Sequence, residues 1–373
     1  MKSFILLLCF VNSYSFYLHM NNMKNTNWNS FQFTLKEQAR KWFIDRAISS
    51  GIPWDKLYKK YDDVYEDINT FRYVKEDKMI IYPDYYTRPF HGYDEGNLNW
   101  LAAKEGDAAT LSIAAGYWPK EDPYVAQEWM RQNITQNIKK YIDELGVYPK
   151  QYPKSALDMG CSIGISTEYL QNCFPKSKID GIDLSPYFIA VAAYRNTEHK
   201  LGINYIHGNI EKTTLRDNSY DFIISNFVFH ELPCDAANNV LNEIKRLLTP
   251  GGIVAIIDMD PSNLDKQLKN NIFRKWAFES TEPHIYDYYL RDTCDMLKEN
   301  GFEYITKRRN DPLNSIWLGV KSSKNYLSKN VLSDRFNEPL ESEDNSQTMD
   351  FSDKYKIEDF LLETPRAKYI PII

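Results

Sequence analysis

Residues 157–167 read LDMGCSIGIST and carry the strongest structural signal in the chain. Asp158 closes a short apolar strand, small residues make a turn, and a helix follows. Gly160 and Gly164 have no Cβ, so the backbone between them can approach a ligand closely. We expect Asp158 to accept hydrogen bonds from a cationic amino group. This turn is only moderately specific by itself, because glycine-rich strand-to-helix turns bind many ligands.

From residue 156 onward, short apolar strands alternate with amphipathic helices. We expect strands over residues 156–159, 178–182, 204–207, 222–225 and 252–258, and helices over residues 166–174, 186–198 and 235–248. Repeated alternation of this kind specifies a parallel sheet with helices on both faces. The fold class is therefore α/β, doubly wound and mostly parallel, preceded by an N-terminal helical extension.

The second strand ends at Asp183, within the sequence GIDLSP. A carboxylate in this position can accept hydrogen bonds from both ribose hydroxyls of an adenosine group. Capping of the next helix is the alternative role for Asp183, because Pro186 suits a first helical turn. A nicotinamide dinucleotide is disfavoured, since Ser162 and Ile165 replace two glycines of its fingerprint.

The ends of the third and fourth strands supply the other expected site residues. Asn209 is placed to reach an adenine amino group, with Ile210 against the ring, and the fourth strand leads to Ser225, Asn226, His230 and Glu231. Ligands of open parallel sheets bind at this edge. His230, with Glu231 beside it, is the candidate general base, which is needed only if the acceptor must lose a proton. The alternative for His230 is packing at the helix start.

Five ordered motifs resemble the class I S-adenosylmethionine-dependent methyltransferases, most closely the ubiquinone/menaquinone-biosynthesis type. They are LDMGCSIGIST, GIDLSP, HGNIE, DNSYDFIISNFVFHEL and LLTPGG, and the resemblance covers about half the chain. It implies a Rossmann-like seven-stranded sheet and methyl transfer from S-adenosylmethionine to a small-molecule acceptor. The cofactor-binding residues that it implies are Asp158, Gly160, Ser162, Gly164, Asp183, Leu184, Asn209, Ile210, Ser225 and Asn226. The chain departs from the family where Ser162 replaces a common glycine and Asn209 a commoner acid.

Two further runs are similar to uncharacterised plant plastid and cyanobacterial methyltransferase-like proteins, namely residues 82–103 and 278–290. They contribute a second set of candidate pocket residues: His91, Tyr93, Asp94, Glu95, Glu279, Glu282, His284 and Tyr288. Helix capping is an equal alternative for Glu282. A protein or RNA methyltransferase, and a non-catalytic S-adenosylmethionine-binding partner protein, stay open as alternative functions.

Composition narrows the choice of partners. The chain has 373 residues and a formal net charge of −6, which argues against a nucleic-acid partner. Its five cysteines lack the spacing of a zinc site, and no metal is expected. The oligomeric state is not determined by the sequence.

Four regions are expected along the chain. They are a targeting segment (residues 1–30), an N-terminal helical region (31–140), the methyltransferase domain (141–325) and an acidic, disordered tail (326–373). The apolar run at residues 4–11 has signal-peptide length and is too short for stable membrane insertion. With the basic, acid-poor stretch that follows, it is typical of a plastid or apicoplast address, and secretion is the alternative.

Overall fold

A computed structural model describes residues 40–146, 152–268 and 281–322, all of which belong to one compact unit, Met1–Ser333. The expected targeting segment and the expected acidic tail lie outside the described residues.

The centre of the unit is a seven-stranded sheet with the order β3-β2-β1-β4-β5-β7-β6. Its strands are β1 (Ser155–Met159), β2 (Lys178–Asp183), β3 (Asn204–His207), β4 (Tyr220–Asn226), β5 (Leu248–Met259), β6 (Phe302–Arg309) and β7 (Asn314–Lys321). The first five strands pair in parallel, and β7 runs antiparallel to both β5 and β6. This arrangement confirms the doubly wound, mostly parallel seven-stranded sheet.

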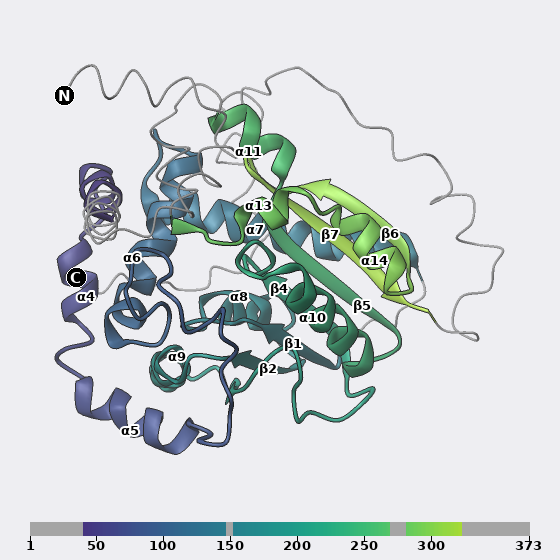
Figure 1. Cartoon of the computed structure of the whole chain (residues 1–373), viewed down its shortest axis with the longest axis horizontal. Coiled ribbons are helices and arrows are strands. Elements are labelled where there is room, and N and C mark those ends of the chain that lie inside the picture. Colours follow the sequence, from purple (N-terminus) through teal and green to yellow (C-terminus); the bar gives the residue numbers. More distant parts are fainter. Residues whose placement is uncertain (1–39, 147–151, 269–280, 323–373) are drawn as a thin grey trace, which may run out of the picture. The chain divides into compact units, whose positions relative to one another are not determined.

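Helices cover both faces of the sheet (Figure 1). On one face, α10 (Cys234–Leu247) and α14 (Thr293–Glu299) pack over Leu157, Met159 and Ile223 in the main hydrophobic core. On the other face, α8 (Ile165–Cys173) follows β1 and contacts α7 (Pro123–Leu145). The second crossover helix, α9 (Pro186–His199), packs against β2 and β3. Strand residues alternate between these two layers because their side chains have a period of two.

One strand is longer than expected. The sequence LLTPGG was expected to form only a turn before a strand at residues 252–258, yet β5 already begins at Leu248. Leu248 pairs with Tyr220, whereas Ile253 pairs with Phe222, so β5 has extra residues that form a bulge. Gly251 lies in this bulge with φ +83°, a conformation that glycine adopts at no steric cost.

The N-terminal region is helical, as expected. A helix over residues 40–49 is followed by α4 (Trp54–Lys59), α5 (Tyr65–Lys75), α6 (Trp100–Tyr117) and α7. Asn99 caps α6 by accepting a hydrogen bond from the Ala102 N–H at 2.8 Å. Helices α5 and α6 both pack against α9, so this region joins the flank of the sheet.

Short elements complete the unit at the carboxyl edge of the sheet. They are the 3₁₀ turn η1 (Phe229–Glu231), α11 (Pro261–Leu268) and α13 (Ile285–Tyr289). No helix in the described ranges is both long enough and apolar enough to cross a membrane.

A buried ion-pair network joins the N-terminal helices to the sheet domain. The Arg195 guanidinium on α9 lies 2.7 Å from Asp107 on α6 and 2.9 Å from Glu168 on α8. Tyr61 donates a hydrogen bond of 2.6 Å to the same Asp107. Burial would raise the pKa of Asp107, but Arg195 and Lys60 outweigh it and lower the pKa to about 2. The charged pairs are therefore maintained at neutral pH.

Arg195→Leu tests this network. The substitution leaves two buried carboxylates without their main cation, which costs about 3–5 kcal/mol of unfolding free energy. Urea denaturation followed by circular dichroism measures the loss. Lys41→Ala, which breaks only the exposed pair with Asp45, is the control and is expected to unfold like the wild type. A loss below about 1 kcal/mol for Arg195→Leu contradicts a structural role for the network.

Candidate functional site

A cavity of about 490 Å³ lies at the carboxyl edge of the parallel strands. Its walls come from the turn after β1, the end of β2, the segment after β4, the N-terminal helices, residues 85–97 and residues 281–284. Ligands of open α/β sheets bind at this edge, and the volume suits a cofactor with a small second ligand. The fold thus brings segments that are far apart in the sequence around one enclosed space.

The glycine-rich turn is held against β2 by Asp183. The Ser162 N–H donates to Asp183 Oδ2 at 2.8 Å, and the Ser185 N–H donates to Oδ1 at 2.8 Å. Gly164, with φ +87°, begins α8, and a Cβ there would overlap the Tyr205 hydroxyl. Burial raises the pKa of Asp183 to about 6, so the carboxylate is ionised at neutral pH. Each of its oxygens keeps a free lone pair to accept a bond from a ligand.

Seven of the expected cofactor and catalytic residues at the strand ends line the cavity with Asp183. They are Gly160, Ser162, Leu184, Ile210, Asn226, His230 and Glu231. From the second candidate set, His91, Tyr93, Glu282 and His284 also line it, whereas Asp94, Glu95 and Tyr288 are outside the lining. Glu279 lies outside the described residues.

Asp158 does not occupy its expected place. Its side chain is fully buried beneath the cavity wall and is not part of the lining. It accepts hydrogen bonds from Ser166 Oγ at 2.7 Å and Thr167 Oγ1 at 2.8 Å, and a longer one from Asn226 Nδ2 at 3.4 Å. Contrary to the expectation from the sequence, Asp158 is therefore not placed to contact an amino group of a ligand. It instead has a positioning role, in which it orients Asn226.

Three other expected cofactor residues also lie outside the lining. Asn209 Oδ1 accepts from the Glu211 N–H at 2.9 Å, which stabilises the turn after β3. Ser225 Oγ donates to the Met159 carbonyl at 2.9 Å and links β4 to β1. Gly164 acts through the backbone at the start of α8. All three support the wall of the cavity rather than facing it.

The sequence analysis missed Arg131, which projects from α7 into the cavity wall. Its guanidinium lies within 6.0 Å of the ring centroids of Tyr169 and Phe227. Its Nε and Nη1 atoms are buried without a hydrogen-bond partner among the described residues, as is Asn226 Oδ1. Unpaired buried polar groups are costly, so they indicate a place for a ligand. Burial lowers the pKa of Arg131, which nonetheless remains a cation.

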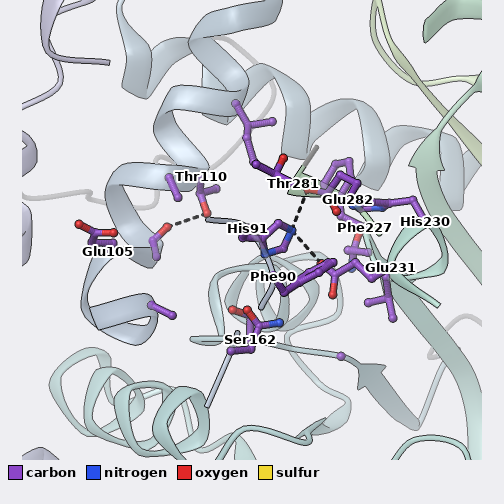
Figure 2. Close-up of a pocket in the computed structure, with 18 of the residues that line it drawn as sticks. Phe90, His91, Glu105, Thr110, Ser162, Phe227, His230, Glu231, Thr281 and Glu282 are labelled. Carbon is purple, nitrogen blue, oxygen red and sulfur yellow. Dashed lines mark hydrogen bonds and ion pairs between the residues drawn. The ribbon is translucent and has the colours of Figure 1, made fainter. Parts of the chain in front are cut away.

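Two histidines and two glutamates meet at the other side of the cavity, where Figure 2 shows His91 between Glu231 and Glu282. His91 Nε2 is 3.5 Å from Glu231 Oε1 and 3.3 Å from Glu282 Oε1. The His91 N–H also donates to the Thr281 carbonyl at 3.3 Å. This backbone contact joins residues 85–97 to residues 281–284.

A buried aspartate that the sequence analysis also missed holds His230. Asp258 Oδ1 is 2.8 Å from His230 Nδ1, and Asp258 Oδ2 accepts from the His230 N–H at 3.1 Å. Burial alone would lower the pKa of His230, but Asp258 outweighs it and raises the pKa to about 9. Burial raises the pKa of Glu282 to about 8 and that of Glu231 well above its ordinary value. Burial and the neighbouring His230 lower the pKa of His91 to about 3.

Comparison with known proteins agrees with this geometry. Residues 157–256 match the family described as "Methyltransferase domain". The malonyl-[acyl-carrier protein] O-methyltransferase of Halalkalibacterium halodurans is 28% identical over 135 residues, which are 35% of this chain and 49% of that protein. The demethylmenaquinone methyltransferase of Listeria monocytogenes is 29% identical over 151 residues, which are 35% of this chain and 62% of that protein.

Among solved structures, a methyltransferase from Aquifex aeolicus has a TM-score of 0.38 and 22% identity, over 49% of this chain and 88% of its own. The chain spans about half the length of the Halalkalibacterium relative and less than two thirds of the Listeria relative. The matched residues contain the glycine-rich turn, Asp183 and His230. The chain therefore carries a class I S-adenosylmethionine-dependent methyltransferase domain.

Proposed function

We propose that the protein transfers a methyl group from S-adenosylmethionine to a small-molecule acceptor. The observation that carries this proposal is Asp183, held by two backbone N–H groups on the wall of the cavity, directly beside the glycine-rich turn. When bound, S-adenosylmethionine supplies an electrophilic methyl group on a sulfonium. The remaining task of the chain is to bind and orient the two reactants, which supplies much of the rate acceleration in such reactions.

The described residues fit the parts of this cofactor. Asp183 offers free lone pairs to the two ribose hydroxyls, and Leu184 and Ile210 give apolar surface for the adenine ring. The unpaired Arg131 nitrogens suit the carboxylate of the methionine portion. The unpaired Asn226 Oδ1 suits its ammonium group, with the Asn226 amide oriented by Asp158.

The acceptor would bind beside His91, His230, Glu231 and Glu282, where the polar side chains on the other side of the cavity meet. His230 and Glu231 are the proposed groups for proton transfer if the acceptor must lose a proton, and His230, with a pKa of about 9, can accept that proton only in its deprotonated form, which alkaline pH favours. Residues from 85–97 and 281–284 line this end, and the cavity volume of about 490 Å³ favours a small acceptor over a protein or RNA chain. The relatives are named for acting on malonyl-[acyl-carrier protein] and demethylmenaquinone, so acceptors differ within the family.

Asp183→Ala tests the cofactor site. Removing the carboxylate deletes two charge-assisted hydrogen bonds, each worth about 1.5–3 kcal/mol, so affinity for S-adenosylmethionine should fall at least about a hundredfold. Isothermal titration calorimetry measures the affinity, and a thermal melt checks that the variant folds. Asp235→Ala removes an exposed acid outside the cavity and serves as the control. Unchanged affinity in Asp183→Ala, or no binding to the wild type, contradicts the proposed function.

Arg131→Gln tests which end of the cofactor Arg131 binds. Methylthioadenosine lacks the amino-acid portion of S-adenosylmethionine, so its affinity should not change in this variant. Affinity for S-adenosylmethionine should fall about tenfold to a hundredfold through loss of the ionic hydrogen bonds. The same titrations with Arg216→Gln, an exposed arginine outside the cavity, provide the comparison. If both ligands weaken equally in Arg131→Gln, Arg131 supports the fold and does not bind the carboxylate.

Residues 1–30 are proposed to direct the protein to a plastid or apicoplast-like organelle, because an apolar signal-length run precedes a basic, acid-poor stretch. A fluorescent protein fused behind residues 1–30 should accumulate in that organelle, and a fusion without residues 1–11 should stay in the cytosol. Release of the first fusion into the medium would instead establish the alternative, secretion.

A further inference from the structure

We propose a divalent transition-metal site at the acceptor end of the cavity, with donor atoms supplied by His91, His230, Glu231 and Glu282. Ion binding requires only these side chains and is independent of the proposed methyl transfer. Its use in methyl transfer, by contrast, rests on the proposed function.

The spacing of the donor atoms suits such an ion. One ligand atom each from His91, His230 and Glu231 lies within 4.8 Å of the others. His91 Nε2 lies 3.5 Å and 3.3 Å from the nearest oxygens of Glu231 and Glu282. Tetrahedral ligands at about 2.0–2.2 Å from a metal ion lie about 3.3–3.6 Å from each other. The described side chains therefore need only small rotations to share one ion.

Asp258 provides the support that metal-binding histidines require. It is fully buried and lies 2.8 Å from His230 Nδ1, while the His230 side chain lines the cavity. When Nδ1 carries the proton in this pair, Nε2 is left with a lone pair for a metal ion. A carboxylate on the second ring nitrogen fixes the tautomer and orientation of the ligand in many metal sites. The pairing with Asp258 therefore fixes the orientation of the His230 ring on the 3₁₀ turn η1.

Glu282 is the independent observation that points to a ligand. Its side chain is only 6% exposed, and its Oε2 atom has no hydrogen-bond partner among the described residues. A buried carboxylate with one oxygen unpartnered is costly, and a cation is the partner that compensates it most completely. Binding of an ion would release the protons that burial favours on Glu231 and Glu282, and the resulting carboxylates, with Asp258 behind His230, suit a dication. The mixed imidazole and carboxylate set favours an ion such as Zn²⁺, Mn²⁺ or Fe²⁺.

Such an ion would define the class of acceptor. Acceptors with an oxygen donor that can join the ion as a fifth ligand, such as a hydroxyl beside a carbonyl or a second hydroxyl, would be oriented in the cavity. A bound hydroxyl would lose its proton to solvent water more easily, because the charge of the ion stabilises the oxyanion. The oxyanion would then take the methyl group from S-adenosylmethionine, and S-adenosylhomocysteine would leave. His230 and Glu231 would then act as ligands rather than as bases.

Metal content measures the proposal directly. The full chain is treated with a chelator, dialysed against Zn²⁺ or Co²⁺ and then freed of excess ion. Mass spectrometry of the metal should give about one ion per chain, and the Co²⁺ form should show the intense visible absorption of a four-coordinate site. This metal measurement uses neither S-adenosylmethionine nor an acceptor. A failed titration with S-adenosylmethionine would therefore leave the measured metal content unaffected.

Variants test whether the ion binds to the four proposed ligands. His91→Ala and Glu282→Gln should each weaken Zn²⁺ affinity at least about tenfold and abolish the Co²⁺ absorption. Glu282→Gln keeps the shape of the side chain, so it covers the case in which His91→Ala does not fold. His199→Gln is the matched control, because His199 pairs with Glu168 at 3.2 Å outside the cavity. Retention of the ion by both cluster variants, its loss in His199→Gln, or no ion in the wild type overturns the proposal.

Discussion

The carboxylate of Asp183 is the interaction on which the arrangement of the site depends. It ends β2 and accepts the backbone N–H groups of Ser162 and Ser185, so it connects the turn after β1 to the start of α9. The parallel register places β1 and β2 side by side, and this brings their ends to one edge. A buried carboxylate is tolerated there because fixed N–H dipoles replace part of its lost hydration. The same buried carboxylate thereby holds the turn in place and offers a hydrogen-bond acceptor to the cavity.

The edge of the sheet forms only part of the cavity wall. The helix over residues 40–49, α6, α7 and residues 85–97 complete the walls, and the Arg195 network ties α6 to α8 and α9. The cofactor end is thus lined mainly by the sheet, with Arg131 supplied by α7. The acceptor end is lined by turns whose positions depend on packing against the sheet. The two ends of the cavity are therefore built by different parts of the chain.

The sequence predicts those parts of the structure that are encoded over short distances. The five parallel strands and their helices follow from local alternation, and Asp183 is recognisable because it ends a strand next to a helix cap. Asp158, Asn209 and Ser225 occupy equally suggestive positions, yet their side chains bond to nearby groups beneath the wall. Sequence spacing places a residue at the sheet edge but does not determine on which side of the backbone its side chain lies.

Arg131 and Asp258 show the other limit of the sequence. Arg131 lies on an amphipathic helix with many polar residues, and the packing of α7 against α6 and α8 turns it inward. Asp258 meets His230 across 28 positions, through the pairing of β4 with β5. Both contacts arise from tertiary structure, in which residues distant in sequence are brought together. The antiparallel strands β6 and β7 likewise carry no local signal that separates them from other apolar runs.

The hydrogen bond from the His91 N–H to the Thr281 carbonyl has a consequence for how the cavity tolerates substitution. It joins two loops that belong to neither the strands nor the crossover helices, and it uses backbone atoms only. Substitutions other than proline at residue 91 therefore leave this backbone link between the two loops intact. Exchange of the two loops as a matched pair would keep this contact and change the side chains at that end of the cavity.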